Sequence, residues 1–195
     1  FDGALFEKSK QVHRQCKAKN AAYLYCDLAF VNVLGARLSV HEATGAPIAQ
    51  DYDDVMELVT SIEQRHKNDI YALQEEMAAH ATLAQHQLRA QENAAGVLGR
   101  LDSALLRCTA TPGADAFCFE ADVRRGWVRA DAATADKDAL QWLERAESAA
   151  KQAVLGSPRS ADTLYLMAEA QLRLARRMVK PKVRARLLQE GRWVA

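Results

Sequence analysis

The four cysteines are the residues of this sequence with the widest range of possible chemistry. Nine residues separate Cys16 from Cys26, and nine residues also separate Cys108 from Cys118. Each pair brackets a predicted turn between helices, and no Cys/His cluster has the spacing of a metal site. We therefore expect four reduced cysteines that are mostly buried as small apolar side chains, with disulfide bonds as the alternative.

The histidines and glycines form no catalytic or cofactor-binding motif. No HExxH occurs and no two histidines are four residues apart, so all five are expected to be structural. They are His13, His41, His66, His80 and His86. The segment from Gly96 to Gly99 lacks the Lys-Ser/Thr pair and the preceding strand of a phosphate-binding loop. The sequence therefore predicts a protein that is not an enzyme, with no metal and no cofactor.

A basic segment near the end of the chain is the sharpest local charge feature. It contains Arg173, Arg176, Arg177, Lys180, Lys182, Arg184, Arg186 and Arg192, against a single acid, Glu190. Such a segment suits an acidic protein, RNA or anionic lipid, although a solvated outer face is the favoured alternative. Acids concentrate at 51–54 and 115–138, so opposite polarity along the chain suits head-to-tail contact with a charged partner.

Composition predicts an all-α protein. Of the 195 residues 49% are apolar, alanine supplies much of that fraction, and no segment alternates with the period of a strand. The net charge of +1 makes nucleic acid an improbable partner, and no apolar run approaches the length of a membrane span. About nine helices are expected, with a loop at 39–50. Their ranges are 1–17, 21–38, 51–66, 69–90, 95–108, 116–130, 138–154, 163–177 and 183–195.

An aromatic residue recurs along the chain at a nearly constant interval. Tyr23, Tyr71, Phe119 and Tyr165 lie 48, 48 and 46 residues apart, and each follows a candidate helix cap. The caps are Asn20, Asn68, Asp115 and Asp162. This period predicts stacked helical hairpins with units at roughly 20–68, 69–115, 116–162 and 163–195.

The hairpin at 138–177 resembles the tetratricopeptide repeat (TPR). Small residues of the second TPR helix match Ala146, Ala150 and Ala153, and its closing proline matches Pro158. The large–large–small start of the next helix matches Leu164, Met167 and Ala168. The resemblance implies one domain over 1–195, a right-handed α-solenoid with long, degenerate repeats whose first helices line a concave, partner-binding face.

The resemblance places the groove positions of the clearest unit on Asp162, Tyr165, Glu169, Leu172 and Arg173. Adding the basic segment gives the predicted partner-binding set. Its members are Asp162, Tyr165, Glu169, Arg173, Arg176, Arg177, Lys180, Lys182 and Arg184. Tyr165 suits an interface anchor, but packing between repeats is the preferred interpretation of this residue.

The predicted function is a non-catalytic protein-interaction scaffold or a structural subunit of a larger complex. Three alternatives stay open: a regulatory array cut from a bacterial signalling kinase or caspase-like protease, an accessory subunit of a mitochondrial complex, and an RNA-binding helical repeat. Because the chain begins with Phe1 and not Met, it is expected to be either a piece of a longer protein or a chain from which a leader, such as a mitochondrial transit peptide, has been removed. A soluble protein of the cytoplasm, or of mitochondria after that removal, is expected, and the sequence does not decide between them. The cysteine spacing is also similar to that of helical-hairpin proteins of the mitochondrial intermembrane space.

Overall fold

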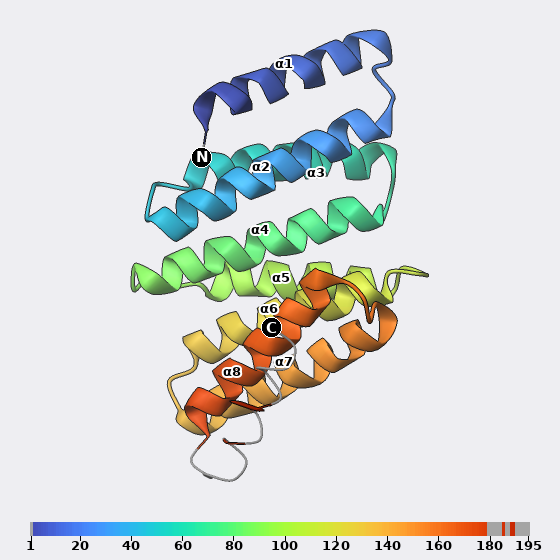
Figure 1. Ribbon diagram of the computed structural model, residues 1–195. Helices are drawn as coiled ribbons and strands as arrows, with labels where there is room; N and C mark the ends of the chain where they lie inside the picture. The colour runs from blue at the N-terminus through green and yellow to red at the C-terminus, as the bar shows by residue number, and fades with distance from the viewer. Residues whose placement is uncertain (1, 179–184, 186–187, 190–195) are drawn as a thin grey trace.

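The described part of the chain is entirely helical, which confirms the all-α prediction. The computed structural model describes residues 2–178, 185 and 188–189, and these residues contain eight long α-helices and no strand (Figure 1). The helices are α1 (Gly3–Lys19), α2 (Leu24–Thr44), α3 (Ala49–Arg65), α4 (Ile70–Arg89), α5 (Ala95–Thr109), α6 (Asp115–Ala132), α7 (Asp136–Gly156) and α8 (Ala161–Arg177). The ninth helix, expected at 183–195, falls almost wholly outside the described residues.

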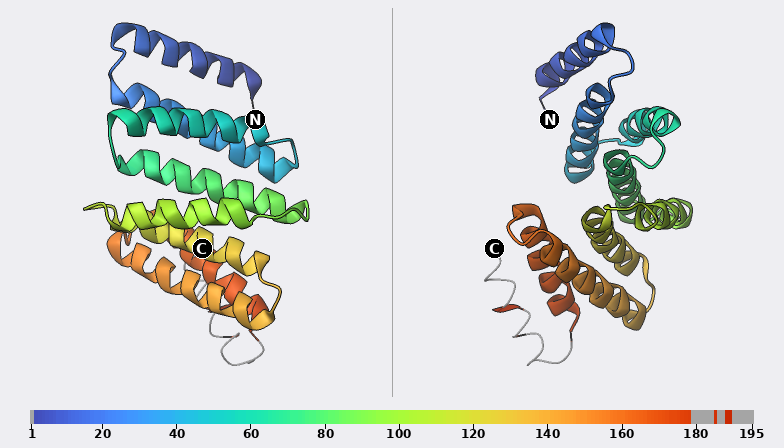
Figure 2. Two further views of the ribbon diagram at one scale, coloured as in Figure 1. Left: turned by 180° about the vertical axis from the view of Figure 1, so that it is seen from behind. Right: turned by 90° about the vertical axis from the view of Figure 1, so that its right-hand side faces the viewer.

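Consecutive helices pack as antiparallel neighbours and build a curved stack (Figures 1 and 2). Helix α4 packs against α2 on one side and α6 on the other, whereas the backbones of α3, α5 and α7 do not approach one another. Because α2, α4 and α6 pack closely while α3 and α5 lie farther apart, the stack curves toward the side of α2, α4 and α6. Helices α2, α4 and α6 therefore form its inner face, as the right-hand view of Figure 2 shows.

The long loop predicted at 39–50 is wrong. Helix α2 continues to Thr44 and α3 begins at Ala49, so only four residues connect the two helices. Gly45 ends α2 in the left-handed conformation with φ 73°, which costs glycine little because it has no Cβ. Arg37 of α2 pairs with Asp51 of α3 at 2.7 Å and draws the two helices together across this short turn.

The repeat interval is shorter than the aromatic anchors indicate. Helices α2, α4, α6 and α8 begin at residues 24, 70, 115 and 161, which is an interval of about 46 residues. Tyr23 precedes α2, whereas Phe119 lies a full turn inside α6, so the four predicted anchors are not equivalent positions. The expected caps are also displaced: Asp69 caps α4 and Ser160 caps α8 through their side chains.

Small residues let the helices of the last hairpins approach closely. A Cβ placed on Gly126 of α6 would lie 2.8 Å from the Ala146 Cβ and 2.9 Å from the Trp142 carbonyl oxygen of α7. Ala146, Ala150 and Ala153 are fully buried, in agreement with their predicted packing role. Among the described residues the core consists of four clusters along the stack, and larger side chains such as Leu38 and Ile62 fill the cluster of the first helices.

Both cysteine pairs form disulfide bonds, so the expectation of reduced cysteines is wrong. Cys16–Cys26 joins α1 to α2, and Cys108–Cys118 joins α5 to α6, with Cα–Cα distances of 5.9 and 5.7 Å. Each bond spans a tight turn between antiparallel helices, where residues near the facing helix ends come within the range a disulfide requires. Closing a loop of this length stabilises the folded chain by about 2–3 kcal/mol in the chain-entropy account.

Candidate functional site: an inner groove

The inner face carries a cavity of about 290 Å³ that is enclosed by three helices from three successive hairpins. We call this cavity the inner groove. Its lining comprises Asn32, Gly35, Ala36, Leu38 and Ser39 of α2, Gln74, Glu75, Ala78, Ala79 and Thr82 of α4, and Phe117, Glu120, Ala121 and Arg124 of α6. On each helix these residues recur at spacings of three and four, so they form one helical face.

Glu75 occupies the middle helix of the inner groove. Its carboxyl group lies against Gly35 of α2, at a point where a side chain on residue 35 would collide with it. Burial raises the pKa of Glu75 to about 7, with partial compensation from the positive charge of Arg124. Near neutral pH this group therefore exchanges readily between its protonated and charged forms.

Two further charged residues face the same space from α6. Burial raises the pKa of Glu120, the charge of Arg124 opposes that rise, and the neighbouring charge of Asp162 adds to it. The charge of Arg124 acts on both Glu75 and Glu120, but these three residues form no ion pair or hydrogen bond among the described residues. The groove thus holds charged groups whose hydrogen-bonding capacity is unused by the fold.

A row of aromatic residues follows the first turns of the inner helices. Tyr25, Tyr71 and Phe117 occupy the second position of α2, the second of α4 and the third of α6, at intervals of one structural repeat. Tyr25 is 64% exposed and Tyr71 is 52% exposed, while the rings of Tyr71 and Phe117 meet edge to face at 5.7 Å. Of the three rings, Phe117 lines the inner groove and Tyr71 contacts it, whereas Tyr25 lines a separate pocket between α1 and α2. Aromatic side chains beside a groove are frequent anchors for a protein partner.

The predicted site residues on α8 lie mainly outside the inner groove. Tyr165 is 65% exposed, so its preferred interpretation as a packing residue is wrong. Arg173 stacks on Trp127, with its guanidinium carbon 4.7 Å from the ring centroid, and pairs with Glu169 at 2.7 Å. Arg177 pairs with Asp136 at 2.9 Å, so these two arginines are engaged within the fold.

Five predicted positions remain, of which two are exposed and three lie outside the described residues. Asp162 is exposed and acts on Glu120 electrostatically, which places it near one end of the inner groove. Arg176 is exposed and forms no ion pair among the described residues. Lys180, Lys182 and Arg184 lie outside the described residues.

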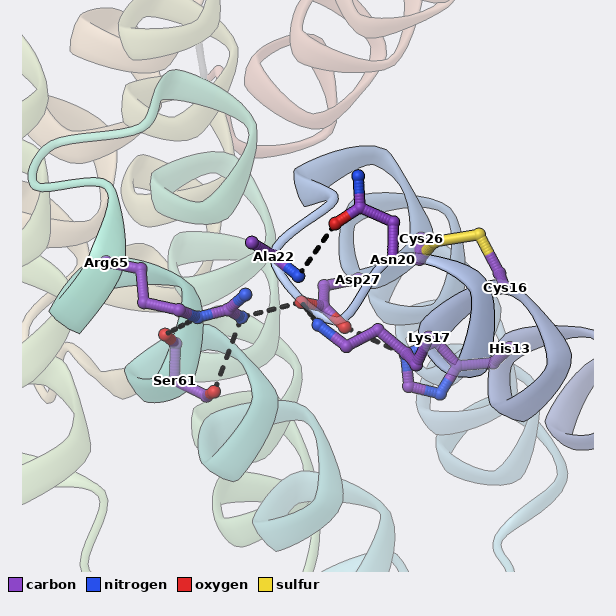
Figure 3. Close-up of polar contacts among 9 residues, drawn as sticks. All are labelled: His13, Cys16, Lys17, Asn20, Ala22, Cys26, Asp27, Ser61 and Arg65. Atoms are coloured by element: carbon purple, nitrogen blue, oxygen red, sulfur yellow. Dashed lines mark hydrogen bonds and ion pairs between the residues drawn. A yellow bond between two sulfur atoms is a disulfide. The ribbon is translucent and has the colours of Figure 1, made fainter.

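The strongest polar cluster elsewhere joins α1, α2 and α3 beside the Cys16–Cys26 disulfide (Figure 3). Asp27 is 1% exposed and accepts hydrogen bonds from Lys17 at 2.8 Å and Arg65 at 2.6 Å, while His13 Nε2 lies 2.8 Å from its other oxygen. Burial alone would raise the pKa of Asp27, but these bonds outweigh it and lower the pKa to about 2. Every partner is satisfied within the fold, so the cluster is structural.

Sequence reasoning missed Glu75, Glu120 and Arg124 because no motif marks them. The aromatic row was detectable: Tyr25, Tyr71 and Phe117 are spaced by 46 residues, whereas the chosen anchors are spaced mainly by 48. The correct interval would have placed residues 71–82 and 117–124 on a shared face with 25–39.

The fold and groove define a class, an all-α stack of helical hairpins with a charged inner face. The chain shows no significant match to a protein-family model, to a curated protein or to a solved structure. Among the described residues, none of the helices combines the length and apolar character that crossing a membrane requires. Within the same residues no group of histidine, cysteine and acidic side chains is placed to hold a metal ion.

Proposed function

We propose that this protein is a TPR-like, non-catalytic scaffold that holds an extended segment of a partner protein in its inner groove. The observation that carries the proposal is the convergence of three helices on one cavity whose charged groups have no partner in the fold. Burial penalises the ionised forms of Glu75 and Glu120, and polar groups of a bound partner would offset that penalty. Phe117 in the lining and the exposed Tyr71 against it supply apolar surface for the same partner.

The experiment compares two tryptophan substitutions in captures of partners from the native source. Ala36→Trp fills the inner groove from an exposed position of α2. Leu106→Trp alters an outer position of α5 that is 71% exposed, and it is the matched control. A partner retained by the wild type and the control but lost by Ala36→Trp supports the proposal. A partner retained equally by all three proteins refutes the inner groove as the binding surface.

We also infer that the folded protein works in an oxidising compartment rather than in the reducing cytosol. Two disulfides at equivalent turns of the stack favour an exported location or a compartment such as the mitochondrial intermembrane space. The check is mass spectrometry of protein taken from its source with free thiols blocked during lysis. Alkylation of Cys16, Cys26, Cys108 and Cys118 would refute the inference, and four protected cysteines would support it.

A further inference from the structure

We propose that the inner groove selects an arginine side chain of the partner segment and binds its guanidinium group at the carboxylates of Glu75 and Glu120. This inference rests on the proposed function, because it assigns the chemistry of the segment that the groove holds. It concerns a particular side-chain site rather than the curved surface as a whole.

Acidic groups outnumber basic groups at the inner groove. Glu75 and Glu120 supply two carboxylates, Asp162 adds a third nearby, and Arg124 is the single positive charge of the lining. Elsewhere in the stack carboxylates between helices are paired, as Asp27 is with Arg65 and Glu63 is with Arg107 at 2.6 Å. The charge of Arg124 acts on both groove carboxylates but forms no ion pair with either among the described residues, so an external cation complements them.

Small residues line the walls of the groove. Ala36, Ala78 and Ala121 are small and leave room for one long side chain to enter beside Glu75. A guanidinium group is planar, presents five donors and is less strongly hydrated than an ammonium group. A carboxylate in this space therefore matches arginine better than lysine, since a guanidinium loses its hydration more easily and can donate two parallel hydrogen bonds to one carboxylate.

Two aromatic rings lie one helical turn from the groove carboxylates. Tyr71 and Phe117 stand at the first turns of α4 and α6, and Glu75 and Glu120 follow them by one helical turn. An extended segment with its arginine in the groove would thus set a neighbouring residue against these rings. An apolar residue next to the arginine is the expected preference.

The binding should depend on pH because Glu75 must be ionised to accept the guanidinium group. Besides Glu75, the polar residues of the lining are uncharged Asn32, Ser39, Gln74 and Thr82, with Glu120 and Arg124 from α6, and Arg124 is the residue whose charge acts on the pKa of Glu75. With a pKa of about 7 for Glu75, affinity should be about tenfold weaker at pH 6 than at pH 8. Glu120 acts in the same direction because its pKa is raised as well.

The test uses fluorescein-labelled, N-acetylated and C-amidated heptapeptide pools with a fixed central arginine, lysine, glutamine or glutamate. Binding is measured by fluorescence anisotropy with the intact protein at pH 6 and pH 8. The variants are Glu75→Gln/Glu120→Gln, the blocked groove Ala36→Trp, and Glu144→Gln as a control on an exposed position of α7. Arg124→Gln removes the internal competitor for the two carboxylates.

The proposal predicts at least a tenfold preference for arginine-centred over glutamate-centred pools. The preference should vanish in Glu75→Gln/Glu120→Gln, persist in Glu144→Gln and increase in Arg124→Gln. Binding that Ala36→Trp abolishes but that shows no preference for arginine, or prefers glutamate, overturns this inference and leaves the proposed function standing. Equal binding of all pools by wild type and Ala36→Trp overturns both. Circular dichroism verifies that every variant is folded, and Asn32→Arg is a second blocking variant at an exposed position.

Discussion

Replacing Glu75 with glutamine should stabilise the protein, and the gain should grow with pH. The folded state raises the pKa of this carboxyl from 4.5 to about 7, so ionisation is penalised in the folded chain only. Folding stability from this group is therefore complete below pH 4.5 and is lost as the pH rises toward 7 and beyond. The raised pKa of Glu75 therefore lowers the free energy of unfolding by about 3 kcal/mol at pH 8 and by under about 1 kcal/mol at pH 5.

Urea denaturation followed by circular dichroism at pH 5 and pH 8 measures the effect. Glu75→Gln should raise the free energy of unfolding by about 3 kcal/mol at pH 8 and change it little at pH 5. Glu144→Gln, at an exposed position of α7, should stay within about 0.5 kcal/mol of the wild type at both values. A gain for Glu75→Gln that is equal at both pH values, or a loss at pH 8, would refute the burial argument.

Three further predictions concern stability elsewhere in the stack. Cys108→Ala/Cys118→Ala should lower the free energy of unfolding by about 2–3 kcal/mol, and dithiothreitol should then have a smaller effect on its urea midpoint than on that of the wild type. Gly126→Ala should cost about 1–3 kcal/mol because the new methyl group meets the α7 backbone, whereas Gly99→Ala, with nothing within 4 Å, should stabilise α5 by up to about 1 kcal/mol. If the melting temperatures of Gly126→Ala and Gly99→Ala shift in the same direction, the packing argument is contradicted. Between pH 4 and pH 2 the wild type should lose about 2 kcal/mol as Asp27 becomes protonated, a loss that Asp27→Asn should not show in acid titration.

The amino-acid sequence predicts the helices well where an alanine stripe meets clear end signals. The hairpin at 138–177 is the best example, since Gly156 ends α7 and the buried alanines fall on one face. The segment 39–44 was misjudged because its polar residues resemble a loop, while the Arg37–Asp51 pair that extends the helix joins residues from two elements. Local sequence patterns therefore predict the presence of a helix more accurately than the residues at which it begins and ends.

The groove itself was beyond sequence reasoning for a spatial reason. Gly35 and Glu75 lie forty residues apart, and only the packing of α2 on α4 brings the carboxyl against the glycine. The disulfides are a different case, because the position of each cysteine pair around a predicted turn is already compatible with a bond. Treating cysteines as small apolar residues gave too little weight to that geometry.

The attachment of α1 has a consequence for how the protein is digested. Among the described residues of this helix only Phe6 is buried, so α1 is held largely by the Cys16–Cys26 bond and the contacts of Asp27. Trypsin cleaves after Lys8, Lys10 and Arg14, and cleavage there requires the helix to unfold locally, which its attachment opposes. Brief trypsin treatment should therefore remove α1 from the reduced protein before it cuts within the stack. The size of the surviving fragment would then report whether the Cys16–Cys26 bond of a sample was intact or reduced.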